Sequence, residues 1–257
     1  MVVADLHVHT TNSDGQLTLP ELPAAAERAG VETVAVTDHD RLHPELSGPV
    51  TTHEGLTIVH GIELRVETAT QRVDLLGYGV ERTEELTALI DRLQTDRIDR
   101  ARRIVERVED RLDVELAVEY EPGVGRPHIA RAIAESSAPY DYRGAFDELI
   151  GDDGPCYVPR EIPSVSAGRE RLADACALVG LAHPLRYDDP ASALELTADL
   201  DAVERHYPYG RSVDPAPVER AIERHDLLAT GGSDAHDDQL GRAGLTAEQF
   251  GPVRARL

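Results

Sequence analysis

The chain has 257 residues, enough for one large α/β domain or a barrel with an inserted subdomain. It carries 26 basic and 48 acidic side chains, a formal net charge of −22, which disfavours stable binding of duplex nucleic acid or of an anionic membrane. Every basic side chain is Arg, Trp is absent and Phe occurs twice, a composition typical of proteins from a high-salt cytoplasm.

Two cysteines, Cys156 and Cys176, do not form a CxxC pattern, so the sequence predicts neither a disulfide framework nor a thiolate metal site. The N-terminus lacks a charged segment followed by an apolar one, and no apolar run reaches about 18 residues. We therefore expect a cytoplasmic protein without a membrane partner. The sequence leaves the oligomeric state open.

The first elements form a strand–helix–strand unit. Residues 2–6 are apolar apart from Asp5 and predict a buried strand, residues 20–29 predict a helix that ends at Gly30, and residues 31–37 predict a second strand. A helical crossover of this length connects parallel strands, so we expect a mainly parallel sheet.

The next two strands are expected at residues 56–62 and 72–78. The short polar link at residues 68–71 suggests that these two strands form a hairpin.

A helical segment follows. Helical spacing of apolar residues is found over residues 83–112, 127–135 and 142–150. We interpret residues 81–163 as a helical insertion into a single domain that spans residues 1–257. The rest of the chain returns to a helix–strand rhythm, with helices expected at 165–179, 191–200 and 215–225 and strands at 180–183, 200–207 and 227–230.

Imidazoles and carboxylates follow nearly every predicted strand. The residues at these positions are His7, His9, His39, Glu63, His183, Asp234 and His236, and Asp14 follows the first strand in a turn. Because the carboxyl ends of parallel strands in an α/β barrel open onto one face, we expect these side chains to meet there. Histidine with Asp or Glu is a typical ligand set for divalent metals.

These residues and their neighbours resemble the motifs of the PHP (polymerase and histidinol phosphatase) family. The matching stretches are His7-x-His9, Asp14, Thr37-Asp38-His39-Asp40, Gly61-Ile62-Glu63 and Gly232-Ser233-Asp234-Ala235-His236. Further stretches, Arg126-Pro127-His128, Tyr157-Val158-Pro159-Arg160 and Ala182-His183-Pro184, resemble the stand-alone phosphoesterases of the family that act on nucleoside 3′,5′-bisphosphates and on the 5′ ends of short RNAs.

The resemblance implies an α/β fold, a distorted (β/α)7 barrel, with three divalent metals. It assigns to one metal His7, His9, Glu63 and Asp234. It assigns to a second Glu63, His128 and His183, with Asp74 nearby, and to the third Asp14, His39 and His236. The subgroup usually has His where this chain has Asp74, and an aspartate favours Mn²⁺ or Mg²⁺ over softer ions. Mn²⁺ is the expected metal, with Mg²⁺, Fe²⁺ and Zn²⁺ as alternatives.

The implied reaction is attack of a metal-bound hydroxide on a phosphate ester. The candidate catalytic residues are His183, His236 and Asp234, and the candidate substrate contacts are Arg126, Arg160, Arg186 and again His183. Asp38 and Asp40 are expected to orient His39. The sequence does not decide whether Glu204 lines the site.

Three other functions remain open. A histidinol-phosphate phosphatase carries similar motifs, and a non-catalytic regulatory module of the same family is a second alternative. A nucleic-acid-binding protein without catalysis is a third, and the acidic balance and the few aromatic side chains weigh against it.

Overall fold

The computed structural model describes all residues from Met1 to Leu257. The chain divides into two compact units, one formed by residues 1–88 and 162–257 and the other by residues 89–161. None of the helices is both long and apolar enough to cross a membrane.

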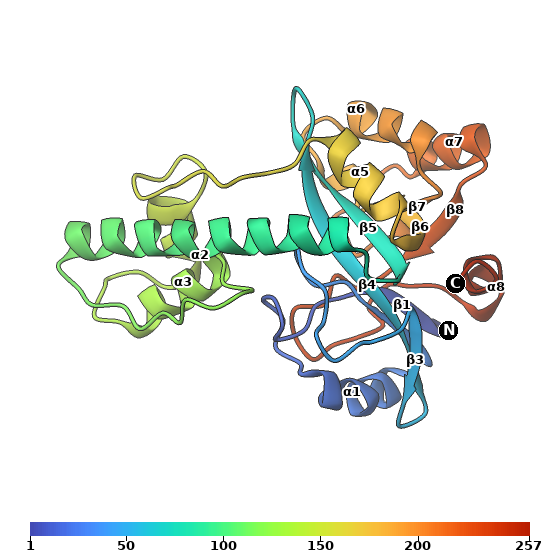
Figure 1. Ribbon diagram of the computed structural model, residues 1–257, viewed down its shortest axis with the longest axis horizontal. Coiled ribbons are helices and arrows are strands. Elements are labelled where there is room, and N and C mark those ends of the chain that lie inside the picture. Colours follow the sequence, from blue (N-terminus) through green and yellow to red (C-terminus); the bar gives the residue numbers. More distant parts are fainter. The chain divides into compact units, whose positions relative to one another are not determined.

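The first unit contains one eight-stranded sheet (Figure 1). Seven strands follow one another in the order β1-β2-β4-β5-β6-β7-β8, and β3 pairs antiparallel with the beginning of β4. The strands are β1 (Ala4–Val8), β2 (Thr33–Val36), β3 (Val50–His53), β4 (Leu56–Glu67), β5 (Arg72–Val80), β6 (Cys176–Leu181), β7 (Ala202–His206) and β8 (Leu228–Gly231).

The sheet curls until its two ends meet. Val8 at the end of β1 forms a parallel bridge with Ala235, just beyond β8, and the His9 N–H donates to the Ala235 carbonyl at 3.0 Å. This closure confirms the expected barrel-like α/β fold and brings the first and last sequence motifs together.

The predicted hairpin is present, and it changes the direction of the sheet. β5 pairs antiparallel with both β4 and β6, whereas the β1–β2–β4 and β6–β7–β8 groups are parallel, so the sheet is mixed. Because β5 runs the opposite way, Asp74 near its beginning lies at the same edge as Glu63 near the end of β4. The hairpin register pairs Asp74 directly with Arg65.

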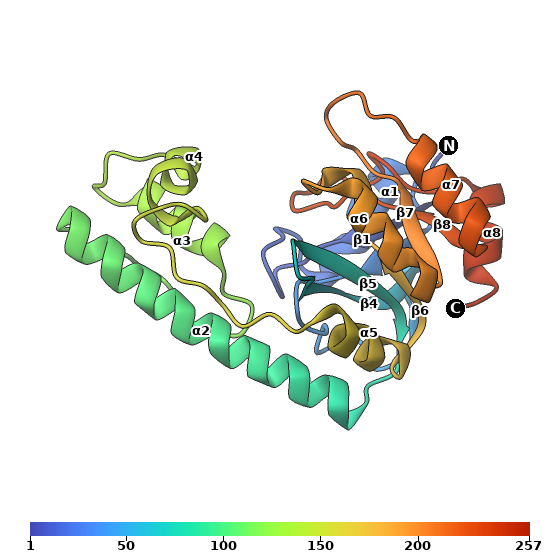
Figure 2. The same ribbon diagram turned by 90° about the horizontal axis from the view of Figure 1, so that it is seen from above.

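Helices cover the outside of this sheet (Figure 2). They are α1 (Leu22–Ala29), α5 (Val165–Ala173), α6 (Pro190–Glu195), α7 (Ala216–His225) and α8 (Ala247–Arg254). Helix α1 ends as expected at Gly30, which has the left-handed φ of 70° that glycine adopts without strain. The barrel interior is closed by buried apolar side chains such as Leu6, Leu76 and Leu178.

The boundary between α5 and β6 differs from the sequence prediction. The helix expected over residues 165–179 ends at Ala173, and β6 already begins at Cys176. The apolar run from residue 175 to 181 is compatible with a helix or with a buried strand, and pairing with β5 and β7 selects the strand. Strand β3 was not predicted, because its sequence, Val-Thr-Thr-His, carries a single apolar residue.

The second unit is helical. Helix α2 (Glu84–Leu112) begins in the first unit and continues into the second, where α3 (Arg126–Glu135) and α4 (Tyr142–Ala145) follow. A π-helical turn, Phe146–Ile150, continues α4. The unit has its own core, in which Ile104, Val108 and Ile129 are fully buried.

Candidate metal centre

The first two histidines lie side by side at the end of β1. His7 and His9 are both 0% exposed, and the alternation of a strand directs them to the same face of the sheet. His7 Nδ1 lies 3.1 Å from Glu204 Oε1 on β7 and donates to this carboxylate. This bond fixes the tautomer of His7 and leaves its Nε2 directed away from Glu204.

Glu63 on β4 stands at the centre of the histidines. Its Oε1 lies 3.4 Å from His7 Nε2 and 3.1 Å from His183 Nε2. Its Oε2 lies 3.4 Å from His9 Nε2 and 2.7 Å from His39 Nδ1. Burial alone would raise the pKa of Glu63, but His39 and His7 outweigh it and hold the pKa well below its usual value. Glu63 is therefore a buried, ionised carboxylate.

Asp234, beyond β8, is a second carboxylate close to His7 and His9. Its Oδ1 lies 3.1 Å from His9 Nε2 and 3.5 Å from His7 Nε2. Its Oδ2 accepts hydrogen bonds from the Tyr207 hydroxyl at 2.8 Å and from Arg186 Nη1 at 3.1 Å. Burial would raise the pKa of Asp234, but His7 and His9 lower it well below its usual value.

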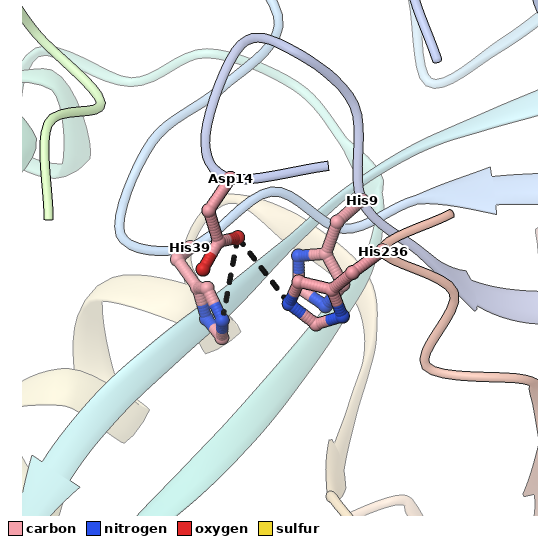
Figure 3. Close-up of side chains that lie close together, drawn as sticks. All are labelled: His9, Asp14, His39 and His236. Atoms are coloured by element: carbon pink, nitrogen blue, oxygen red, sulfur yellow. Dashed lines mark ion pairs between the residues drawn. The ribbon is translucent and has the colours of Figure 1, made fainter. Parts of the chain in front are cut away.

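Asp14 and His236 complete a second group around His9 (Figure 3). Asp14 Oδ1 lies 3.3 Å from His236 Nε2 and 3.8 Å from His39 Nε2. The rings of His9 and His236 stack at 4.2 Å between centroids. Burial opposes the ionisation of Asp14, but His39 and His236 hold its pKa far below the usual value.

The ligand atoms form three groups, in each of which the atoms lie within 4.8 Å of one another. We call them the His7 cluster, the Asp14 cluster and the Asp74 cluster. They consist of His7, His9, Glu63 and Asp234; of His9, Asp14, His39 and His236; and of Glu63, Asp74 and His183. The structure thus brings together nine of the ten sequence-predicted ligands, and His9 lies in two groups rather than one.

The first two clusters fit divalent metals. His7 Nε2 and both ring nitrogens of His9 are buried and make no hydrogen bond. Buried polar atoms are normally satisfied, so such nitrogens beside ionised carboxylates fit a bound cation.

The Asp74 cluster differs, because a guanidinium already holds its aspartate. Arg65 Nε donates to Asp74 Oδ1 and Arg65 Nη2 donates to Asp74 Oδ2, both at 2.6 Å. Asp74 Oδ2 lies 3.7 Å from His183 Nε2. Both oxygens of the carboxylate are thus engaged by a cation, so this donor set fits a divalent metal poorly.

The tenth predicted ligand, His128, lies on α3 in the second unit. Arg126 lies on the same helix, and Arg160 lies near the end of the second unit. Arg126 Nη1 pairs with Asp152 Oδ1 at 2.6 Å. These three residues remain predictions.

The structure assigns supporting roles to Glu204, which the sequence left open, and to Tyr207 and Arg65, which it did not single out. Glu204 not only holds His7 but also accepts from the His183 N–H at 2.7 Å. Tyr207 supports Asp234, and Arg65 holds Asp74. No motif marks a lone polar residue on a strand, so only the fold reveals these contacts.

Asp38 has a different role from the expected one. Its carboxylate accepts bonds from the Thr10 N–H and hydroxyl, from Ser13 Oγ and from Asn12 Nδ2. It therefore fixes the turn that leads to Asp14 rather than the ring of His39. Asp40 accepts from the Arg65 N–H at 3.0 Å.

Two site residues have unusual backbone angles. His183 has a φ of 27° and Asp234 a φ of 49°, both in the region that side chains other than glycine rarely adopt. Such angles are kept where the surrounding contacts enforce them, and they concentrate at functional sites.

A mixed α/β barrel whose strand ends carry buried clusters of His, Asp and Glu belongs to the class of metal-assisted hydrolases. The model of the PHP domain family matches residues 5–154, more than half of the chain. This protein therefore belongs to the PHP domain family, which confirms the resemblance seen in its motifs.

Characterised relatives are similar over nearly the whole chain. The 3′,5′-nucleoside bisphosphate phosphatase of Chromobacterium violaceum is 27% identical, over 92% of this chain and 88% of the relative. The phosphoribosyl 1,2-cyclic phosphate 1,2-diphosphodiesterase of Eggerthella lenta is 30% identical, over 91% of this chain and 94% of the relative. The 5′-3′ exoribonuclease Rnm of Escherichia coli is 27% identical, over 94% and 89%. These relatives confirm the expected class, an enzyme that hydrolyses phosphate esters.

Solved structures show the same fold. A structure from Bifidobacterium adolescentis superposes with a TM-score of 0.81 at 24% identity, and covers 99% of this chain and 96% of its own. An amidohydrolase from Chromobacterium violaceum has a TM-score of 0.77 at 23% identity, over 98% and 96%.

Proposed function

We propose that this enzyme releases phosphate or mononucleotides from small nucleotidic substrates, either nucleoside 3′,5′-bisphosphates or the 5′ ends of short RNAs. The observation that carries the proposal is that the buried Nε2 atoms of His7 and His9 make no hydrogen bond and lie 3.1–3.5 Å from the ionised carboxylates Glu63 and Asp234. Two of the similar enzymes are named for these substrates.

The His7 and Asp14 clusters would each hold one divalent metal. Metals bound there supply a nucleophile from water at neutral pH and neutralise charge on the phosphoryl oxygens. We propose Mn²⁺, because the donors are imidazoles and carboxylates without a thiolate. The resemblance predicts a third metal, but the Asp74 cluster fits a metal poorly because Arg65 bonds both oxygens of its aspartate.

The protein's own groups would position the phosphate. Arg186 uses Nη1 for Asp234 and Tyr207, and its side chain is 58% exposed, which leaves further donors of the guanidinium for a phosphate oxygen. His183 Nε2, held 3.1 Å from Glu63 Oε1, is our candidate proton donor to the leaving oxygen. We retain His236 and Asp234 as catalytic candidates.

Three residues of the second unit belong to the same proposal. We propose that His128 contributes to the centre and that Arg126 and Arg160 contact a second phosphate of the substrate, as the resemblance implies. Replacing each by alanine tests this. Loss of His128 should weaken Mn²⁺ binding, whereas loss of a phosphate contact of Arg126 or Arg160 should raise the KM for a bisphosphate more than that for a monophosphate.

The test is release of phosphate from adenosine 3′,5′-bisphosphate and of mononucleotides from a 5′-phosphorylated trinucleotide RNA, with Mn²⁺ and with EDTA. We expect hydrolysis that depends on Mn²⁺ and spares the 5′ phosphate of the bisphosphate. Absence of Mn²⁺-dependent hydrolysis of both substrates would contradict the proposal.

A second candidate is cleavage of a cyclic sugar phosphate, which the 30% identity to the Eggerthella lenta enzyme favours. A cyclic ribose phosphate added to the same assay distinguishes the two, and histidinol phosphate tests the other phosphatase of the family. Faster turnover of either compound than of the nucleotides would identify that compound as the substrate and contradict the nucleotidic assignment.

We also propose that the enzyme works in a high-salt cytoplasm. The support is the net charge of −22 with arginine as the only basic side chain, and two cysteines that form no disulfide. Thermal unfolding measured in 0.1 M and in molar KCl tests this. Salt screens the repulsion among the acidic side chains, so the midpoint temperature of unfolding should be higher in molar KCl. An unchanged midpoint would contradict it.

A further inference from the structure

The β4–β5 hairpin places a cation where the resemblance predicts a metal. Glu63 and Arg65 are two residues apart on β4 and share one face of the sheet, and the register pairs Arg65 with Asp74 on β5. The two parallel bonds of 2.6 Å from the guanidinium to the carboxylate are the fork-to-fork geometry of a strong ion pair.

The pair is well fixed on both sides. The Asp74 side chain is 2% exposed, and the Asp74 N–H donates to the Tyr187 hydroxyl at 2.8 Å. The Arg65 N–H donates to Asp40 Oδ1 at 3.0 Å. These bonds fix the backbone of both residues, and the two bonds of 2.6 Å between the side chains fix the guanidinium against the carboxylate.

Arg65 also keeps a free donor. Its Nε and Nη2 serve Asp74, whereas Nη1 makes no hydrogen bond, and the side chain is 36% exposed. The guanidinium is thus anchored by one edge and presents the other, which is the arrangement that binds a phosphate oxygen.

Charge separates this cluster from the other two. In the His7 cluster Arg186 donates to Asp234 Oδ2 alone, at 3.1 Å, and Asp234 Oδ1 faces His7 and His9. In the Asp74 cluster Arg65 engages both oxygens of the carboxylate at 2.6 Å. A cation bonded to Asp74 would have the like charge of the guanidinium next to it.

We propose that Arg65 takes the place of a third metal, so that the enzyme holds two metals and uses the Asp74-anchored guanidinium as a fixed cation for the substrate phosphate. This inference rests on the proposed phosphoesterase function. Asp74 then positions Arg65 and is not itself a ligand.

The test is metal stoichiometry. The purified protein is equilibrated with Mn²⁺ and passed through a desalting column, and bound Mn²⁺ per chain is measured by mass spectrometry. We expect two for the wild type. Arg65→Met frees the Asp74 carboxylate and should raise the count to three, and Arg65→Ser with Asp74→His should do the same. Asp74→Asn should leave two, and so should the control Arg72→Met, which removes an arginine from the same hairpin.

Kinetics provide the second readout. Arg65→Met should raise the KM for adenosine 3′,5′-bisphosphate by about tenfold, while Arg72→Met should leave it unchanged. Three Mn²⁺ in an active wild type, or two in both Arg65 variants, would overturn the role of Arg65 and leave the phosphoesterase function intact. A wild type without Mn²⁺ or hydrolysis would overturn the proposed function and this inference with it.

Discussion

The His7 and Asp74 clusters share Glu63, and they differ in the partner of their second carboxylate. Asp234 in the His7 cluster faces His7 and His9, and a hydroxyl and a half-exposed arginine support it from behind. Asp74 instead gives both oxygens to Arg65. The comparison indicates that the same residue types at the same strand ends suit either a metal or an ion pair, according to whether an arginine engages one oxygen of the carboxylate or both.

The largest effect is expected from the residue that both clusters share. Glu63→Gln removes the buried charge that faces four histidines, so Mn²⁺ binding and phosphate release should fall by more than about 100-fold, the upper range for residues that only support a ligand. Mass spectrometry and a phosphate assay measure both. Glu67→Gln, on the exposed end of the same strand, is the control. Retained metal in Glu63→Gln would contradict the central position of Glu63.

Glu204→Gln tests the support of the His7 cluster. Loss of the charge behind His7 Nδ1 should weaken Mn²⁺ binding by roughly 10- to 100-fold, and saturating Mn²⁺ should largely restore kcat. A Mn²⁺ titration of the activity measures this, with the exposed Glu195→Gln as control. Unchanged Mn²⁺ affinity would show that the bond from His7 to Glu204 is dispensable.

Tyr207→Phe tests the support of Asp234 and should have a smaller effect. It removes one donor to Asp234 Oδ2 and keeps Arg186, so we expect about a tenfold weaker Mn²⁺ affinity. The same titration measures it, and Tyr142→Phe, on the surface of the second unit, provides the control. An effect on kcat alone would instead assign the hydroxyl to the reaction.

The smallest effect on activity is expected at His60, a buried histidine that has no carboxylate partner. Its side chain lies on β4, its residue is 1% exposed, and neither ring nitrogen makes a hydrogen bond. Burial, with Arg82 and His43 nearby, lowers the pKa of His60 to about 4. In the unfolded chain the pKa of this histidine is about 6.5, so between pH 6.5 and pH 4 only the unfolded state takes up the proton. The free energy of unfolding should therefore fall by about 3 kcal/mol as the pH drops from 6.5 to 4.

His60→Leu should remove this part of the pH dependence and leave metal binding unchanged. Urea unfolding at pH 7 and pH 5 measures the difference, with the exposed His53→Leu as control. Equal pH dependence of wild type and His60→Leu would contradict the assignment.

The sequence contains enough to predict the barrel and the meeting of most candidate ligands, because residues at strand exits lie together whatever the details of packing are. It does not reveal the Arg65–Asp74 pair, since that contact depends on the register of the hairpin, and a slip of one residue would move Asp74 to the other face. The role of Glu204 stayed open for a similar reason: its partners His7 and His183 are 197 and 21 residues away.

The most direct test of the two-metal centre is anomalous diffraction from crystals grown with Mn²⁺. We predict two peaks per chain, one among His7, His9, Glu63 and Asp234 and one beside Asp14 and His236, with Arg65 still bonded to Asp74. A third peak bonded to Asp74 and His183, with Arg65 displaced, would contradict the account.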